Sequence, residues 1–444
     1  MSLQNLKYFK SSLNNLTVKP TLFTGVTSLE EFDAKMPKLT DTSYMFTGCT
    51  SLHTFRGGLD AVVTASSMFK DCTSFTTFHG DMNALVNGDD MFEGCTELQY
   101  FTGHLPKLNS GSEATPAMFN ACKKLIKFEG NLNALENAST MFEGCTSLTT
   151  FIGNLGACKK ANKMFYNTAL SSFTGDLEVL TDGEGMFDGC SKLASFSGKL
   201  TALKNGEGMF NGCSSLTSFS GDCPALTDAE NMFAGTKLQS FEGTLNSLET
   251  GTGMFNGCST LTSFTGNLPK LKYATNMFAG TKLQSFEGTL NVLENGEGMF
   301  NGCSTLTTFT GDLPALTAGR NMFQGTALAA FSGSLAALQT GEGMFTNCDK
   351  LVSFTGDMIG LQNGSGMFSG CTSLTTFTDS NDGYVDMPSM TNGSGMFVGC
   401  NKLTTFKGRM DALTTADSMF EGCDALEHFE ADLNAMTDIN GIFA

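Results

Sequence analysis

The sequence predicts an α/β repeat solenoid, with short parallel strands on one face, short helical turns on the other, and a curved body. A Met-Phe dipeptide recurs every 22 or 23 residues along most of the 444 residues. Glycine, cysteine, leucine and phenylalanine keep fixed places between successive dipeptides. Most aromatic residues are phenylalanine, with 39 Phe, 6 Tyr and no Trp. This bias suggests that one structural position is filled many times. A fixed period of this length is typical of a solenoid.

Numbering each repeat from its methionine as slot 0 gives Met 0, Phe 1, Gly 3, Cys 4, Leu 7, Phe 10, Gly 12, Leu 14 and Leu 17. Leu22-Phe23 and Ile442-Phe443 fit the same register. The slot 0 methionines are Met45, Met68, Met91, Met118, Met141, Met164, Met186, Met209, Met232, Met254, Met277, Met299, Met322, Met344, Met367, Met396 and Met419. We therefore expect one solenoid over residues 1–444 with about nineteen repeats. Residues 1–21 form an N-terminal partial repeat, and residues 419–444 form the C-terminal end.

Two periodicities within a repeat predict its local structure. Phe 10, Gly 12 and Leu 14 alternate with polar residues, which predicts a short strand with these three facing inward. Gly 12 would leave room for a Met or Phe opposite. Met 0, Phe 1, Cys 4 and Leu 7 are spaced as on one face of a short helical turn, and Gly 3 would end that turn with a positive φ. Because helical turns need more width than strands, we expect the body to curve.

Four repeats are one residue shorter, and in each a threonine replaces Cys 4. These residues are Thr168, Thr236, Thr281 and Thr326. A threonine hydroxyl can bond its own backbone, so we expect these threonines to close a tighter corner.

The run Met-Phe-x-Gly-Cys-x-x-Leu-x-x-Phe, as in residues 141–151, resembles the core of the BspA-type, or Treponema-type, leucine-rich repeat. The resemblance covers essentially the whole chain, although Gly 12 and Leu 14 replace the apolar residue and proline usual in that family. It implies a leucine-rich-repeat-like fold without catalytic residues. Such repeats resemble adhesion and interaction modules of bacterial surface proteins and of phage and viral gene products.

Composition limits the classes of partner. The formal charge of −18 argues against nucleic acid as a partner and against anionic membranes. No apolar run is long enough to insert into a membrane. The first residues do not resemble a signal peptide, so we expect a cytoplasmic or virion-assembled protein, or a cell-surface protein if a leader has been removed.

Thirteen of the fifteen cysteines occupy slot 4. A cysteine that recurs in one slot indicates a small buried hydrophobe, and we expect these thiols to be reduced, with crosslinking between adjacent repeats as the alternative. His104 and Asp81 share an outward slot in adjacent repeats, which leaves a weak ion pair, a partial metal site or plain solvated residues open. No catalytic, cofactor-binding or metal site is predicted.

Two repeats carry insertions, which in solenoids mark exposed and often functional loops. One adds four residues within 109–117, and the other adds six within 378–386. The acidic Asx-Gly cluster of the second loosely resembles a calcium loop without its final glutamate, and a plain turn is the alternative. The candidate interaction residues are Asn109, Ser112, Glu113, Asp379, Asn381, Asp382, Tyr384 and Asp386.

The sequence favours a non-enzymatic structural or adhesion scaffold of a virion or cell surface, which binds a protein or a surface glycan. An intracellular protein-binding scaffold is the alternative. The end repeats keep their apolar slots, and Met1 and Ala444 both fall in slot 2. We therefore also consider head-to-tail self-association through the solenoid ends. The alternative is that end charges such as Lys7, Lys10, Asp432 and Asp438 keep the ends solvated.

Overall fold

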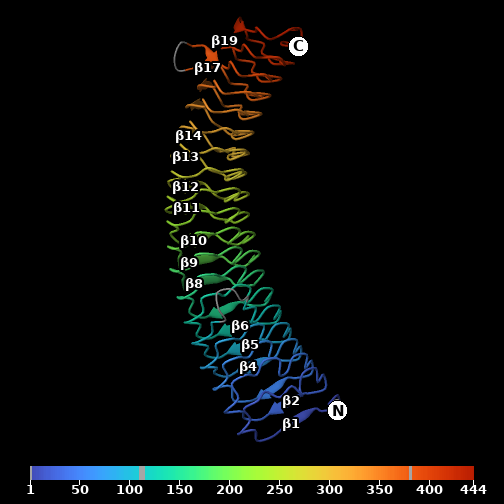
Figure 1. The fold of residues 1–444 in the computed structure, drawn as a ribbon. Coiled ribbons are helices and arrows are strands. Elements are labelled where there is room, and N and C mark those ends of the chain that lie inside the picture. The colour runs from blue at the N-terminus through green and yellow to red at the C-terminus, as the bar shows by residue number, and fades with distance from the viewer. Residues whose placement is uncertain (1–2, 110–115, 380–382) are drawn as a thin grey trace. The chain divides into compact units, whose positions relative to one another are not determined.

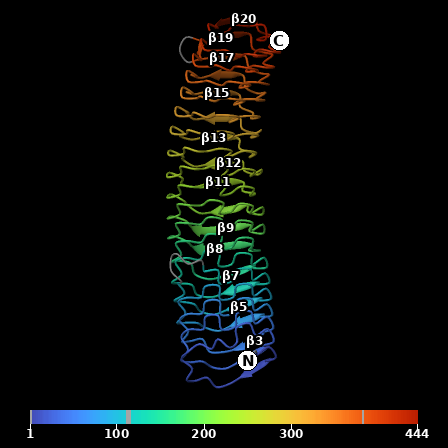
Figure 2. The same cartoon turned by 45° about the vertical axis from the view of Figure 1, so that its right-hand side comes forward.

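The computed structural model describes residues 3–109, 116–379 and 383–444. These residues fall into two compact units, residues 1–223 and residues 224–444. Each unit is a stack of coils, one coil per repeat, with the strands of successive coils lying one beside the next (Figures 1 and 2). A single solenoid over the whole chain stays a prediction.

The strands are short and lie one to a coil except around the second insertion. Unit 1 contains β1 (Tyr8–Lys10), β2 (Glu31–Asp33), β3 (Thr54–Arg56), β4 (Thr77–His79), β5 (Tyr100–Thr102), β6 (Lys127–Glu129), β7 (Thr150–Ile152), β8 (Ser172–Asp176), β9 (Ser195–Lys199) and β10 (Ser218–Ser220). Unit 2 contains β11 (Ser240–Glu242), β12 (Ser263–Thr265), β13 (Ser285–Glu287), β14 (Thr308–Thr310), β15 (Ala330–Ser332), β16 (Ser353–Thr355), β17 (Thr376–Thr378), β18 (Val385–Asp386), β19 (Thr405–Arg409) and β20 (His428–Asp432).

The strands pair in parallel with strands of adjacent coils in short sheets of two to four strands, and residues in the same slot lie opposite one another. Phe241 faces Phe264, and Phe286 faces Phe309. The Phe 10 rings stack along the column, as between Phe241 and Phe264 at 5.7 Å, and each also meets a Phe 1 ring edge-on. Phe264 is buried while Ser263 and Thr265 are exposed, so the predicted inward and outward assignment is confirmed.

The predicted helical turns are wrong: the described residues form no helix. Around Met45, main-chain N–H groups alternate between two kinds of acceptor. Met45 N–H donates to Thr42 O at 3.1 Å within its own coil, while Phe46 N–H donates to Met68 O in the next coil at 2.9 Å. A helix would direct every N–H along its own axis. Here half of them join adjacent coils instead, so the expected cause of curvature is also removed.

Left-handed residues explain why a helix cannot continue through the corner. Slot 3 has a positive φ, as predicted, for example at Gly212 (φ 68). The residue before the methionine is also left-handed, at Gly208 (φ 56) and even at Thr140 (φ 58). Two left-handed residues four positions apart interrupt any right-handed helical run. The inward residues in slots 0, 1, 4 and 7 are therefore brought to one side of the coil by a series of tight turns.

The glycine in slot 12 makes room for a different ring from the one expected. A Cβ placed on Gly198 would lie 2.9 Å from the ring of Phe196, in the same coil, and 2.9 Å from the carbonyl oxygen of Gly175 in the adjacent coil. The missing side chain thus accommodates the coil's own Phe 10 and a close approach between coils. The expectation of a Met or Phe from the opposite side is wrong.

The core of each unit is a set of columns formed by the inward slots. Met209, Phe210, Cys213 and Leu216 are all fully buried, and the same slots are buried in nearly every coil. No helix in the described ranges is long and apolar enough to cross a bilayer.

Candidate interaction surfaces

The cysteines form buried columns whose thiols bond to the main chain. All fifteen are free thiols, and all but the half-buried Cys423 are buried. The slot 4 thiols donate to the Phe 1 carbonyl oxygen of the preceding coil, as from Cys303 Sγ to Phe278 O at 3.0 Å. Burial raises the pKa of the Cys303 thiol to about 11. Since the thiolate is the reactive form, these cysteines are packing residues with little nucleophilic character.

The four threonines of the shorter repeats belong to the same columns. Thr236 Oγ1 lies 3.2 Å from Cys258 Sγ in the next coil, and Thr281 makes the equivalent contact with Cys303. Thr326 Oγ1 also donates to Phe323 O at 2.9 Å, which is the bond to its own coil that the sequence predicted. The sequence did not predict the contact with the neighbouring thiol, because it depends on which repeats stack beside each other.

A shallow groove crosses the outward face of β5, β6 and β7 in unit 1. Its volume is about 520 Å³, and its lining includes Asp81, Thr102, His104, Glu129, Asn131 and Ile152. Ile152 is 49% exposed within this otherwise polar surface. An exposed apolar side chain framed by polar groups is typical of a contact surface.

Asp81 and His104 do lie next to each other in this groove. The contact is made by the main-chain N–H of His104, which donates to Asp81 Oδ1 at 3.0 Å. Within the described part of the chain, no three His, Cys, Asp or Glu side chains converge as metal ligands would. The pair therefore supports the register between coils, and the polar groove around it is the feature that could contact a partner.

The second insertion returns to the stack through β18, whose Val385 and Asp386 pair with Gly408 and Arg409 of β19. Asp386 Oδ1 lies 2.7 Å from the Arg409 guanidinium. The Tyr384 ring lies beneath two cations, with the Arg409 guanidinium carbon 4.6 Å and Lys407 Nζ 5.2 Å from its centroid. These contacts hold the end of the insertion against the outward face of the sheet.

Two further contacts complete the geometry of this insertion. Tyr384 donates a hydrogen bond to Glu430 of β20, which lowers the pKa of that carboxyl group. Asp379 Oδ1 accepts a hydrogen bond from Gly383 N–H at 3.1 Å, as expected of a turn. Asn381 and Asp382 lie outside the described residues. The described acids are thus used in turn and ion-pair contacts, and calcium binding has no support from them.

Among the candidate residues of the first insertion, Asn109 is described, while Ser112 and Glu113 lie outside the described residues. Asn109 occupies slot 18, and its N–H donates to Val86 O in the preceding coil at 2.9 Å, as Val86 N–H donates to Val63 O. The insertion begins there, and Asn109 Oδ1 is buried without a hydrogen-bond partner in the part of the chain that the structure describes. The sequence correctly predicts an interruption of the repeat at this point.

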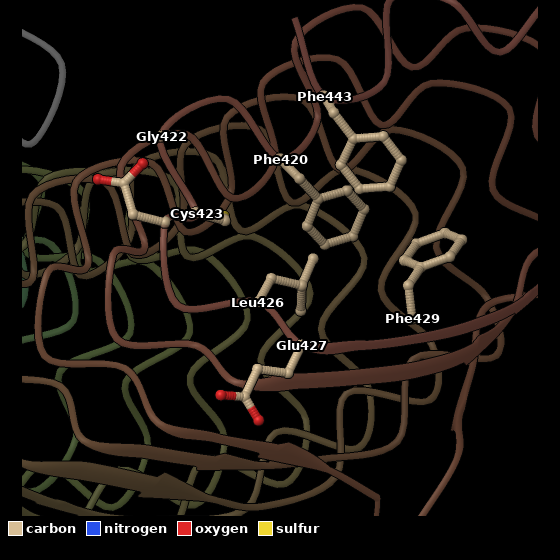
Figure 3. A pocket seen from close by; sticks show the side chains of 8 residues that line it. Phe420, Gly422, Cys423, Leu426, Glu427, Phe429 and Phe443 are labelled. Carbon is tan, nitrogen blue, oxygen red and sulfur yellow. The ribbon is translucent and has the colours of Figure 1, made fainter.

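The last coil forms a cleft of about 320 Å³ that the sequence did not single out. Its lining includes Phe420, Cys423, Leu426, Glu427, Phe429 and Phe443. Figure 3 shows the three phenylalanine rings grouped together, with the Glu427 carboxylate pointing away from them. Phe429 is 36% and Phe443 56% exposed, whereas their equivalents in most inner coils are buried.

The model of the BspA type leucine rich repeat region matches residues 1–126, 115–225, 227–352 and 338–442, in six copies overall. The chain belongs to this family. The match covers nearly every repeat and confirms the resemblance inferred from the Met-Phe-x-Gly-Cys run. Leucine-rich repeat proteins are surface or interaction scaffolds and are typically non-enzymatic.

Solved structures of repeat proteins resemble the chain at low sequence identity. A leucine-rich repeat protein from Bacteroides ovatus is 18% identical, with a TM-score of 0.45, over 94% of this chain and 88% of that one. A leucine rich cell surface protein from Faecalibacterium prausnitzii is 14% identical, with a TM-score of 0.29, over 96% and 86%. An internalin from Listeria monocytogenes is 12% identical, with a TM-score of 0.27, over 85% and 86%. No curated protein sequence matches this chain.

Proposed function

We propose that this BspA-type repeat protein is a non-enzymatic structural or adhesion scaffold of a virion or cell surface, and that it binds a protein or a surface glycan. The observation that carries the proposal is the division of side chains between core and surface. The inward slots bury the same apolar residues and thiols in coil after coil. The outward slots vary and carry the polar groove and the Tyr384 cluster. A constant core with a varied exposed face is the arrangement of a repeat-built binding scaffold.

The groove over β5 to β7 is the proposed contact surface in unit 1. It combines the exposed Ile152 with the carboxylate of Glu129, the amide of Asn131 and the imidazole of His104. Such a mixture provides an apolar contact and several hydrogen-bonding groups, which suits a protein loop or a sugar. Its breadth and shallowness suit surface contact better than enclosure of a small substrate.

The first experiment locates the protein. Gold-labelled antibodies against the chain would be applied to intact source cells and to purified particles, and separately to thin sections. Labelling of the outer surface of cells or particles is expected. Labelling confined to the cytoplasm in sections would overturn the surface role and favour an intracellular protein-binding scaffold. The free state of all fifteen thiols favours that alternative, because reduced cysteines are typical of reducing compartments.

The second experiment tests the groove. Beads coated with the chain would be measured for adhesion to arrays of glycans and of envelope proteins. Ile152→Thr combined with Glu129→Thr should reduce adhesion, because both groups line the groove. Ile359→Thr changes an isoleucine that is 51% exposed outside the groove and serves as the matched control. Equal adhesion by the groove variant and the control would contradict the assignment of this surface.

A further inference from the structure

Two coils carry net charges of opposite sign, and in both of them several residues in the core slots are only half-buried. The basic coil, residues 3–21, contains Lys7, Lys10 and Lys19 and no acidic residue. The acidic coil, residues 419–441, contains no Lys or Arg. Its acids are Glu421, Asp424, Glu427, Glu430, Asp432 and Asp438. The three lysines give the basic coil a formal charge of +3 in a chain whose formal charge is −18. We propose that the basic coil of one molecule docks on the acidic coil of a second copy, as the next coil of its stack.

The charges match slot by slot. Lys7 and Glu427 both occupy slot 8, and Lys10 and Glu430 both occupy slot 11. Within unit 1 the same two lysines already pair with acids in these slots of the adjacent coil. Lys7 Nζ lies 2.8 Å from Glu30, and Lys10 Nζ lies 3.1 Å from Asp33. The acidic coil therefore offers the basic coil the ion pairs that it makes with its own neighbour.

Docking would also continue an alternation of sign along slot 11. In unit 2, Lys407 faces Glu430 across the ladder, and their charged atoms lie 3.5 Å apart. In unit 1, Lys10 faces Asp33, which faces Arg56. Joining the two stacks gives the order Lys407, Glu430, Lys10, Asp33 and Arg56, in which no like charges are adjacent. Directly opposed unlike charges stabilise a ladder and like charges destabilise it.

Apolar residues lie in matching slots on the same two faces. Phe9 and Phe429 occupy slot 10, and both are more exposed than Phe406, the fully buried slot 10 residue of the preceding coil. Leu6 and Leu426 share slot 7, and both are half-buried. Stacking would place each pair in the environment that inner coils already provide, and burial of this apolar area favours association.

The main chain supplies a third kind of complementarity. Glu30 N–H and Glu31 N–H both donate to Lys7 O in the coil before them. The same arrangement joins His428 N–H to Thr404 O. Lys7 N–H and Tyr8 N–H would occupy the equivalent donor positions opposite Glu427 O. Contacts between unlike faces of identical molecules build rings or filaments.

Sedimentation velocity over a concentration series, at low and at high salt, tests the proposal. The 444-residue chain should associate at low salt and dissociate as salt screens the ion pairs. Lys7→Glu combined with Lys10→Glu should weaken association by roughly tenfold or more, because opposed acids replace the ion pairs. Lys159→Glu combined with Lys160→Glu makes the same change of charge on exposed residues elsewhere and should associate normally. A monomer at every concentration and salt, or unchanged association of the Lys7/Lys10 variant, would overturn the proposal.

A charge swap separates lost complementarity from a damaged coil. Glu427→Lys combined with Glu430→Lys should not self-associate, since basic faces would then meet. Mixed with the Lys7→Glu/Lys10→Glu variant, it should form alternating assemblies, because each face then meets its opposite. Failure of the mixture to associate would contradict docking through these slots.

Protection of one thiol gives an independent measure of the contact. Cys423 lies in the cleft of the acidic coil and shares slot 4 with Leu3 of the basic coil. Its reaction with a thiol reagent should slow as association increases and return to the monomer rate in the Lys7→Glu/Lys10→Glu variant. A rate independent of association would show that the acidic coil stays uncovered and would overturn the proposal.

Discussion

Thr168 Oγ1 lies 3.2 Å from Cys190 Sγ in the next coil. Both side chains are buried, and Cys190 Sγ is also 2.9 Å from Phe165 O. The hydroxyl replaces the thiol of a regular coil and meets the thiol of the following one. The shorter repeats thus keep the column continuous while removing one residue from the corner.

Thr168→Val should test that hydrogen bond with almost no change in side-chain volume. Loss of a buried hydrogen bond is expected to cost about 1 kcal/mol of stability. Burial raises the pKa of the Cys190 thiol to about 11, and the Thr168 bond opposes that rise, so the variant should raise the pKa further. Denaturant titration would measure the loss of stability. Thr265→Val, on the exposed strand face, is the control.

The thiols should fall into two classes of reactivity at a dilution where the chain is monomeric. Cys423 is half-buried and should react first, while the fourteen buried thiols should react only after denaturation. Burial raises the pKa of Cys423 to about 11. Below that pH its rate should rise about tenfold per pH unit, because the thiolate is the nucleophile. Cys423→Ala should remove the fast class. Several equally fast thiols, or native disulfides, would contradict the predicted burial.

Left-handed backbone at the corner predicts opposite effects for two substitutions. Thr140→Gly should stabilise the chain, because a β-branched residue at φ 58 is strained. Gly208→Ala should destabilise the chain by about 1 kcal/mol, because Gly208 has φ 56, a conformation that is costly for a residue with a Cβ. Steric clash should add nothing to this cost, because the added Cβ would meet nothing closer than 3.9 Å. Thermal denaturation would compare the two variants with the unmodified chain. The same sign for both would contradict the conformational explanation.

Phe264→Ala should cost about 3–5 kcal/mol, as expected for a large-to-small change in a packed core. Thr265→Ala, one residue along the same strand, should cost less than about 0.5 kcal/mol. Phe264 packs at 5.0 Å from Phe278, whereas Thr265 faces outward. Stability from denaturant unfolding would compare them. Equal costs would show that the column of Phe 10 rings does not form the core.

The sequence predicts the strand face of this fold well. Phe264, flanked by Ser263 and Thr265, has the alternation of a half-buried strand, and the structure confirms it. The corner was assigned the wrong structure because Met 0, Phe 1, Cys 4 and Leu 7 satisfy a helical spacing and a chain of turns equally well. What decides between them is whether Phe46 N–H bonds within its coil or to Met68 O of the next, and the slot spacing within one coil does not encode this choice.

The candidate surfaces were predicted less completely. The insertion at residues 378–386 could be placed from the broken period, yet its contacts with Lys407 and Arg409 depend on coils being adjacent in space. The cleft around Phe420, Phe429 and Phe443 uses ordinary core slots, so nothing in their spacing distinguishes them from buried equivalents. The composition does distinguish the coil that contains this cleft, because no Lys or Arg lies among the acidic residues that follow Arg409.

The central structural claim is that hydrogen bonds between adjacent turns join the coils at their corners, and that the described residues contain no helix. Far-UV circular dichroism of the intact chain tests this claim most directly. The spectrum should be that of strands and turns, without the double minimum of an α-helix. A strong helical double minimum would contradict this structure and restore the α/β solenoid that the slot spacing alone predicts.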